Sequence, residues 1–173
     1  AFTISKANIS PTVSMSGYTY GGTKSTPSVS GNTGSGTVTY YYNTQNKNSD
    51  GTAWTSVSNS SSLNAGTYYM YATVGETTNY NGATTAAVAF TISRATINPT
   101  VSMSGYTYGG IKTTPSVSGN TGNGTVVYYY NTSNSNSNGT AWTNVTSATT
   151  LNAGTYYMYA VVYETTNYSS KTT

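Results

Sequence analysis

The sequence is one unit written twice, and this repeat constrains the fold more than any other feature. Shifting the chain by 88 residues aligns residues 1–85 with residues 89–173 without insertion or deletion, and 64 of these 85 positions are identical. Solenoid repeats have periods of about 20–50 residues and need neighbours to complete their cores. A unit of 88 residues is instead long enough to be a small domain with its own core. The period therefore predicts a tandem array of independent domains.

The composition indicates ordered β-structure. Only 5% of the residues are charged, which by itself is compatible with disorder. The chain nevertheless contains 19 tyrosines and has threonine and valine throughout, and these residue types suit a pleated, half-buried surface. Turn signals such as Ser16-Gly17 and Asp50-Gly51 recur every few residues, and no convincing helical period lies between them. We therefore expect an all-β chain of short antiparallel strands, arranged as a sandwich or barrel.

The β-rich runs and their alternation predict the strands and their faces. Tyr68, Met70, Ala72 and Val74 alternate along one run and are expected to point inward. The second repeat should have the same strands, shifted by 88 residues, except for the last. The expected strands of the first repeat span residues 9–15, 18–20, 25–30, 37–42, 53–57, 66–74 and 86–93.

The joint between the repeats raises a question about strand ownership. Residues 1–5 have the same sequence as residues 89–93, and residue 173 comes before a third copy of this segment. We expect domains at 1–93 and 94–173, the second without its closing strand. Residues 1–5 could belong to a preceding repeat, or form a first strand in their own domain. They could also complete the open edge of a neighbouring molecule, giving head-to-tail strand exchange.

Several function classes are disfavoured by the charged residues. The net charge of +3 is spread thinly, whereas phosphate binding needs clustered Lys and Arg, so nucleic acid is not an expected partner. The chain has no histidine for a catalytic triad and no cysteine, and the second repeat has a single acid, Glu164. We therefore expect no catalysis, no metal and no cofactor. No stretch is long and apolar enough for membrane insertion.

One covalent feature is a candidate: a self-formed isopeptide crosslink between a lysine and an asparagine, in place of a disulfide. Such a bond needs a buried lysine and an adjacent carboxyl group that carries protons, and an apolar site would favour their neutral forms. The alternative is that Lys24 is a solvated charge at a strand edge, a common device against edge pairing. The lysines and acids present in both repeats are Lys24 and Glu76, with their copies Lys112 and Glu164.

Tyrosines supply the candidate binding surface. Alternation places a row of three on the outer face of one sheet in each repeat, where aromatic rings could stack sugars. The alternative is that these rings form cross-strand pairs, worth about 0.2–1 kcal/mol each. Trp54 and Trp142 are expected to be core anchors at a sheet edge, with a glycan platform as the alternative. The six candidate platform residues are Tyr41, Tyr69 and Tyr71, with their copies Tyr129, Tyr157 and Tyr159.

The run Leu-Asn-Ala-Gly-Thr-Tyr-Tyr-Met at residues 63–70 resembles the tyrosine-corner strand of immunoglobulin-like domains. With the Gly-Tyr-Thr-Tyr-Gly-Gly motif at 17–22 and the Ala-Phe-Thr-Ile-Ser joint, the whole unit resembles the immunoglobulin-like repeats of bacterial cell-surface adhesins. The resemblance implies two tandem immunoglobulin-like β-sandwich domains in an elongated arrangement. It also implies an extracellular location, attached to the cell surface or cell wall. The implied role is a structural stalk or spacer whose partners are neighbouring repeats of the same chain. The alternative is a carbohydrate-binding module that uses the outward-facing tyrosine rows to bind glycans.

Overall fold

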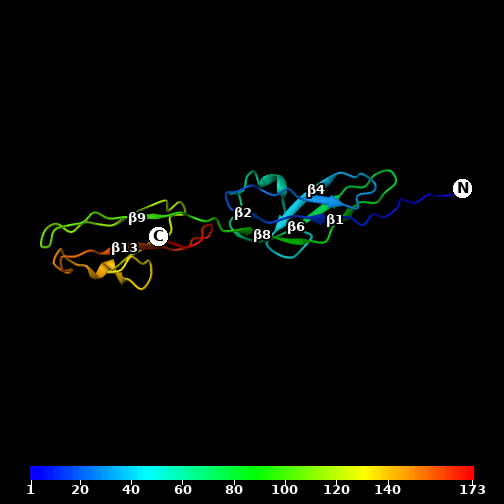
Figure 1. Ribbon diagram of the computed structural model, residues 1–173. Coiled ribbons are helices and arrows are strands. Elements are labelled where there is room, and N and C mark those ends of the chain that lie inside the picture. The colour runs from blue at the N-terminus through cyan, green and yellow to red at the C-terminus, as the bar shows by residue number, and fades with distance from the viewer. The chain divides into compact units, whose positions relative to one another are not determined.

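The computed structural model describes residues 1–173 and divides the chain into two compact units. Unit 1 comprises Ala1–Arg94 and unit 2 comprises Ala95–Thr173. Both consist of β-strands and connecting loops, and each has one short 3-10 helix (Figure 1). The expected all-β class is therefore confirmed.

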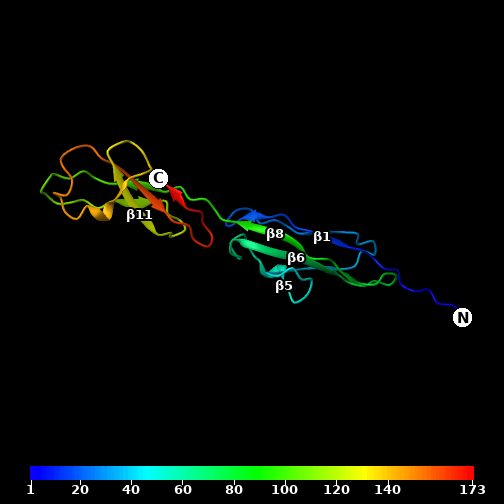
Figure 2. The same ribbon diagram turned by 90° about the horizontal axis from the view of Figure 1, so that it is seen from below.

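Unit 1 contains two sheets. The larger has the strand order β2-β8-β6-β4-β5, and β7 also pairs with β6. Its pairings are antiparallel except for β2 with β8, which is parallel. The smaller sheet pairs β1 with β3. Figure 2 shows β6 and β8 lying side by side. The strands are β1 (Thr12–Ser14), β2 (Tyr18–Thr19), β3 (Ser28–Ser30), β4 (Val38–Asn43), β5 (Thr52–Ala53), β6 (Gly66–Val74), β7 (Ala83–Thr84) and β8 (Val88–Ser93).

The core of unit 1 joins its two sheets and follows the alternation of the sequence. Met70 and Ala72 of β6 are buried, as are Phe90 and Ile92 of β8, whereas Thr91 between them is exposed. The inward face expected for β6 is therefore confirmed at these positions. The other buried members of this cluster are Val13, Met15, Tyr18, Trp54 and Val57.

Unit 2 repeats the central pairing of unit 1 in the same register. Tyr128 lies opposite Ala160, as Tyr40 lies opposite Ala72 in unit 1. Its larger sheet has the order β12-β11-β13-β14, and its smaller sheet pairs β9 with β10. The strands are β9 (Thr100–Ser102), β10 (Ser116–Ser118), β11 (Val126–Asn131), β12 (Thr140–Ala141), β13 (Tyr157–Val162) and β14 (Lys171–Thr172).

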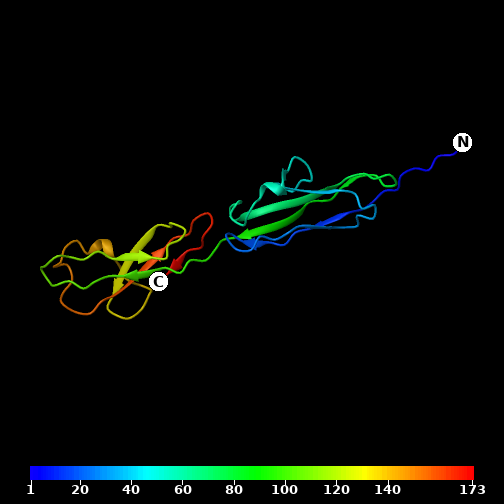
Figure 3. The ribbon, with the colours of Figure 1, turned by 90° about the horizontal axis from the view of Figure 1, so that it is seen from above.

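The structure places the joint strand in unit 1. Residues 89–93 lie within β8, which pairs with β6 on one side and with β2 on the other. Residues 1–5, which have the same sequence, form no strand, and Phe2 and Ile4 are 88% and 86% exposed. Figure 3 shows this N-terminal segment leading away from the strands of unit 1. Of the alternatives for residues 1–5, a first strand in their own domain is therefore not observed.

The expected strand at residues 53–57 is also wrong after its first residue, because β5 ends at Ala53. After β5, a 3-10 helix (Trp54–Ser56) follows, closed by a hydrogen bond of 3.0 Å from the Val57 N–H to the Trp54 carbonyl. The Ser56 hydroxyl donates to the Ala53 carbonyl at 2.7 Å, and the turn buries Trp54. Unit 2 has the corresponding helix at Trp142–Asn144. The local hydrogen bonds of this turn thus replace a strand ladder.

One tyrosine in each unit forms a hydrogen bond with the backbone just upstream of it, near the start of the central strand. The Tyr68 hydroxyl donates to the carbonyl of Asn64, four residues upstream, at 3.0 Å. Tyr156 makes the same contact with Asn152 at 3.1 Å. A tyrosine two residues before a core position, bonded to backbone just upstream, has the geometry of a tyrosine corner.

Candidate functional site

The two crosslink lysines hold the 3-10 turn of their own unit. The Lys24 ammonium group donates a hydrogen bond to the Val57 carbonyl and lies 5.2 Å from the centroid of the Trp54 ring. A cation over the face of an indole ring is attracted by the ring quadrupole. Lys112 repeats the hydrogen bond with the carbonyl of Val145 and lies 5.4 Å from the Trp142 ring centroid. Both lysines are half-buried, and each contacts a backbone carbonyl and an indole ring.

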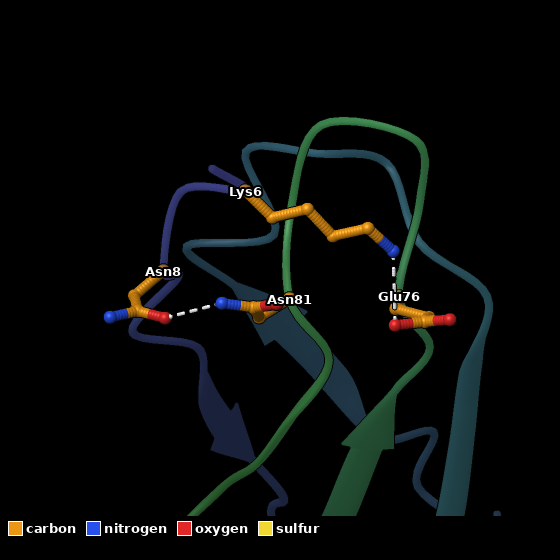
Figure 4. Close-up of polar contacts among 4 residues, drawn as sticks. All are labelled: Lys6, Asn8, Glu76 and Asn81. Carbon is orange, nitrogen blue, oxygen red and sulfur yellow. Dashed lines mark hydrogen bonds and ion pairs between the residues drawn. The ribbon is translucent and has the colours of Figure 1, made fainter. Parts of the chain in front are cut away.

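The acids expected beside these lysines lie on the surface. Glu76 forms an ion pair with Lys6, with 3.1 Å between the carboxylate oxygen and the ammonium nitrogen. The side chain of Glu76 is 70% exposed and that of Lys6 is 36% exposed. Nearby, the Asn81 amide donates to the Asn8 side-chain oxygen at 2.8 Å, and Figure 4 shows both contacts at one end of unit 1. Glu164, the copy of Glu76, is exposed as well. Lys24 and Glu76 thus contact different residues, and the crosslink stays a hypothesis.

The tyrosine rows are not open platforms. Tyr41 and Tyr71 stack across β4 and β6 with ring centroids 5.2 Å apart and an interplanar angle of 16°. Tyr129 and Tyr159 stack in the same way, at 5.2 Å and 13°. Tyr71 and Tyr159 are only 5% and 6% exposed. The structure therefore corrects the expected outer row, because one ring of each row is buried.

The loop that follows β4 accounts for this burial. The Tyr71 hydroxyl accepts a hydrogen bond of 2.9 Å from the N–H of Gly51, at the end of the loop. A Cβ atom on Gly51 would lie 2.7 Å from the Tyr71 ring, so the close approach requires glycine. The Asn43 side chain donates to the Lys47 carbonyl at 3.0 Å and shapes the same loop. The remaining tyrosine of each candidate row is more exposed. Tyr69 is half-buried, and its copy Tyr157 is 38% exposed.

Unit 2 contains a groove beside its central strand β13. Its volume is about 750 Å³, and its walls come from the segment after β9, from the 3-10 turn and from the start of β13. The lining is rich in apolar and aromatic groups. It includes Met103, Gly105, Tyr106, Trp142, Tyr156 and Met158.

In unit 1, the same place is filled by β8. Phe90 packs there between the copies of two groove residues, with its ring centroid 5.8 Å from that of Trp54 and 5.7 Å from that of Tyr68. The backbone of β8 passes so close to Gly17 that a Cβ on this glycine would lie 2.4 Å from the Thr91 carbonyl oxygen. Gly105, the copy of Gly17, has nothing within 4 Å of the corresponding position.

The residues around the empty position are less buried than their copies. Met70 and Tyr18 are buried in unit 1, whereas Met158 and Tyr106 are half-buried in unit 2. Tyr108 is 57% exposed. In addition, β13 begins at Tyr157, three residues after Gly154, the copy of the residue that begins β6. The groove is therefore the space that a strand like β8 would occupy.

The sequence indicated an open edge in the second repeat, through the match between residues 1–5 and 89–93. It did not indicate the groove residues, because their exposure depends on packing between distant segments. The structure holds no group of three or more side chains suited to bind a metal ion. No helix has the length and apolar character needed to cross a membrane. No protein-family model matches the chain, and neither a curated protein nor a solved structure matches it.

Proposed function

We propose that this chain is a structural stalk segment of a bacterial cell-surface adhesin, in which immunoglobulin-like repeats hold a binding or catalytic head away from the cell. In this proposal the protein is extracellular, is attached to the cell surface or cell wall, and takes part in cell adhesion without catalysis. Its two units act as spacers, and the number of units sets the reach of the head.

The observation that carries the proposal is the residue-for-residue repetition of contacts inside the two units. The Lys24 and Trp54 contact recurs as Lys112 and Trp142, with distances of 5.2 and 5.4 Å from nitrogen to ring centroid. The Asn32 side chain bridges both backbone groups of Gly36, and Asn120 does the same with Gly124. Polar and aromatic groups that could have formed a binding site are used to hold loops. A spacer needs such stiff, interchangeable units.

The tyrosine corner and the strand order support the immunoglobulin-like assignment. The neighbouring antiparallel strands β4, β6 and β8 correspond in order to the C, F and G strands of such sandwiches. Tyr68 precedes the buried Met70 by two residues, as the corner tyrosine does in that fold.

The burial of Tyr71 and Tyr159 favours the spacer over the carbohydrate-binding module. A stacking platform needs several exposed rings side by side, and here the paired rings face a loop or each other. The exposed remainder in each unit is too small to form the expected row.

The proposal is tested by displaying a reporter binding domain on bacteria behind zero, one or two copies of the 173-residue chain. Capture of ligand-coated beads through a surface polymer brush should increase with the number of copies. Tyr69→Ala combined with Tyr157→Ala should leave this capture unchanged. Capture that is independent of copy number would contradict the stalk, and saccharide binding lost in the double variant would favour the glycan module.

A further inference from the structure

Residues 6–8 are held to the loop after β6 by a set of hydrogen bonds, here called the clamp. The Ala7 N–H donates to the Asn79 carbonyl, and the Asn81 N–H donates to the Ala7 carbonyl, both over 2.8 Å. The Asn81 side-chain amide donates to the side-chain oxygen of Asn8 at 2.8 Å, as Figure 4 shows. Asn81 therefore takes part in the clamp with both its backbone and its side chain.

The residue after Asn81 is a glycine, and an Asn-Gly pair can react with itself. The backbone nitrogen that follows an asparagine can attack the side-chain carbonyl carbon, and glycine hinders this attack least because it has no Cβ. Asparagine is accordingly among the thermolabile residues of proteins. The chain has three Asn-Gly pairs, at 81–82, 123–124 and 138–139.

The three pairs differ in the hydrogen bonds of the glycine nitrogen. The Gly124 N–H donates to the Asn120 side-chain oxygen at 3.0 Å, and the Gly139 N–H donates to the Tyr159 hydroxyl at 2.9 Å. In the pair at 81–82, the glycine N–H donates no hydrogen bond, and both residues are exposed. Because the nitrogen must give up its proton to attack, a hydrogen bond that holds this proton slows the reaction.

We propose that Asn81–Gly82 is a self-modification site, at which unit 1 converts its own asparagine to aspartate and isoaspartate. The Gly82 nitrogen loses its proton to solvent and forms a bond to the side-chain carbonyl carbon of Asn81. The side-chain nitrogen leaves as ammonia, and a succinimide ring remains. Water then adds to one of the two ring carbonyl carbons that flank the nitrogen, and the C–N bond there breaks. One opening gives aspartate and the other gives isoaspartate, so one water is consumed and one ammonia is released.

The isoaspartate product does not fit the present path of the backbone. It inserts one methylene group into the main chain between Asn81 and Gly82. Even a Cβ atom on Gly82 would lie 2.9 Å from the Val74 carbonyl oxygen and 3.1 Å from the Glu76 nitrogen. The added length must therefore displace either the clamp or β7, which begins at the next residue, Ala83.

The clamp is the weaker of these two neighbours. On the side of β7, the Thr85 hydroxyl accepts a hydrogen bond from the Ala72 N–H at 3.0 Å, and Thr85 is 1% exposed. The residues of the clamp are exposed, and hydrogen bonds between exposed groups open more easily than buried ones. Isoaspartate formation is thus expected to release residues 6–8 from the loop.

Unit 2 has the same backbone bonds without the reactive pair. The Ala95 N–H donates to the Asn167 carbonyl at 2.8 Å, and the Ser169 N–H donates to the Ala95 carbonyl at 2.9 Å. The residues at the place of Asn-Gly are Ser169 and Ser170. The chain therefore carries its own internal reference, and this inference does not depend on the stalk function.

The reaction is tested by incubating the 173-residue chain in mildly alkaline buffer and following each pair by peptide mapping with fragmentation. Conversion at Asn81 should be at least about threefold faster than at Asn123 or Asn138, whose glycine nitrogens are held. The matched control is Asn81→Ser with Gly82→Ser, which gives unit 1 the residues of unit 2 and should abolish conversion at this place.

The role of the hydrogen bond is tested by Tyr159→Phe, which frees the N–H of Gly139. This variant should accelerate conversion at Asn138 and leave the rate at Asn81 unchanged. An unchanged rate at Asn138 would contradict protection of the nitrogen by its hydrogen bond.

Release of the clamp is measured by amide hydrogen exchange in the purified isoaspartate form. The Ala7 N–H should exchange at least about tenfold faster than in fresh protein, and the Ala95 N–H should not change. Conversion at Asn138 that outpaces conversion at Asn81 would overturn the proposal. So would an isoaspartate form in which Ala7 exchanges as it does in fresh protein. Neither result depends on bead capture, so failure of this proposal is distinguishable from failure of the stalk.

Discussion

The hydroxyl of Tyr71 accepts a hydrogen bond from the backbone N–H of Gly51 over 2.9 Å, and Tyr159 does the same for Gly139 at the same distance. These residues lie 20 positions apart in each unit, and the bond ties the end of the loop after β4 to the centre of β6. Each buried tyrosine is thus a loop anchor.

Tyr71→Phe should therefore destabilise unit 1 without a change of fold. The substitution keeps the stacking with Tyr41 but leaves the N–H of Gly51 without its acceptor. The expected loss is about 0.5–1.5 kcal/mol in the free energy of unfolding, measured by urea titration. Tyr69→Phe is the control, since the structure gives the Tyr69 hydroxyl no such bond, and its effect should be under about 0.5 kcal/mol. Equal effects would contradict the anchor.

Gly17 and Gly105 should respond differently to the same substitution. A methyl group at Gly17 meets the Thr91 carbonyl at 2.4 Å, so Gly17→Ala must displace β8 and should cost about 1–3 kcal/mol. Gly105→Ala meets nothing within 4 Å and should change the stability of the monomer by less than about 0.5 kcal/mol. Tryptophan fluorescence separates the units, with Trp142→Phe as background for unit 1 and Trp54→Phe for unit 2. A large loss at Gly105 in dilute monomer would be the contrary result.

Unit 1 should lose stability in alkaline solution through Tyr18. Burial raises the pKa of the Tyr18 phenol above its ordinary value, and the neighbouring Tyr68 and Tyr42 raise it further. The folded state therefore holds this proton more tightly than the unfolded chain. The stabilisation is complete below the unfolded pKa of about 10 and is lost as pH rises through the higher folded pKa.

The variant Tyr18→Phe tests this effect. The Tyr18 hydroxyl is buried and has no hydrogen-bond partner, so its removal should leave stability at neutral pH unchanged or increased by up to about 1 kcal/mol. The loss of stability above pH of about 10 should become smaller in this variant. Urea titrations across the alkaline range measure both. A variant with the alkaline profile of the wild type would contradict the assignment to Tyr18.

Lys24→Gln should weaken the 3-10 turn of unit 1. The change removes the charged hydrogen bond to the Val57 carbonyl and the contact with the Trp54 ring. Together these should be worth about 1–3 kcal/mol, measured by urea unfolding followed by Trp54 fluorescence. Lys47→Gln, in the exposed loop after β4, is the control and should be nearly neutral. A neutral Lys24→Gln would show that the contact contributes nothing.

The intact mass tests the crosslink separately. Lys24 and Glu76 contact different residues, so we expect the measured mass to equal the sequence mass. An isopeptide bond would remove one ammonia molecule per unit. A deficit that disappears in a variant with Lys24→Gln and Lys112→Gln would establish the bond and contradict our expectation.

Local sequence patterns were sufficient for the all-β class and for the inner face of β6. Alternation depends only on neighbouring residues, and Met70 and Ala72 are buried as that pattern predicts. The same pattern could not predict the burial of Tyr71, since it is covered by a loop rather than by the opposite sheet. The 3-10 turn at Trp54 was missed because its hydrogen bonds compete locally with a strand that the residue types also favour.

The candidate site could be predicted from the sequence only in part. The strand at residues 88–93 could be predicted from the sequence, because it lies within the β-rich run at residues 86–93. The importance of Gly17 could not, since it rests on a contact with Thr91, a residue far away in the sequence. Turn-forming glycines and glycines that admit a neighbouring backbone look alike until the chain is folded.

The position of β8 also has a consequence for biosynthesis. This strand lies between β2 and β6 in the sheet, yet residues 88–93 are the last of unit 1 to leave the ribosome. Until then β2 has no partner in the sheet, and the nascent unit 1 exposes an apolar groove like the one in unit 2. Because domains fold in order during translation, unit 1 passes through a period in which its groove stays open until β8 has been made.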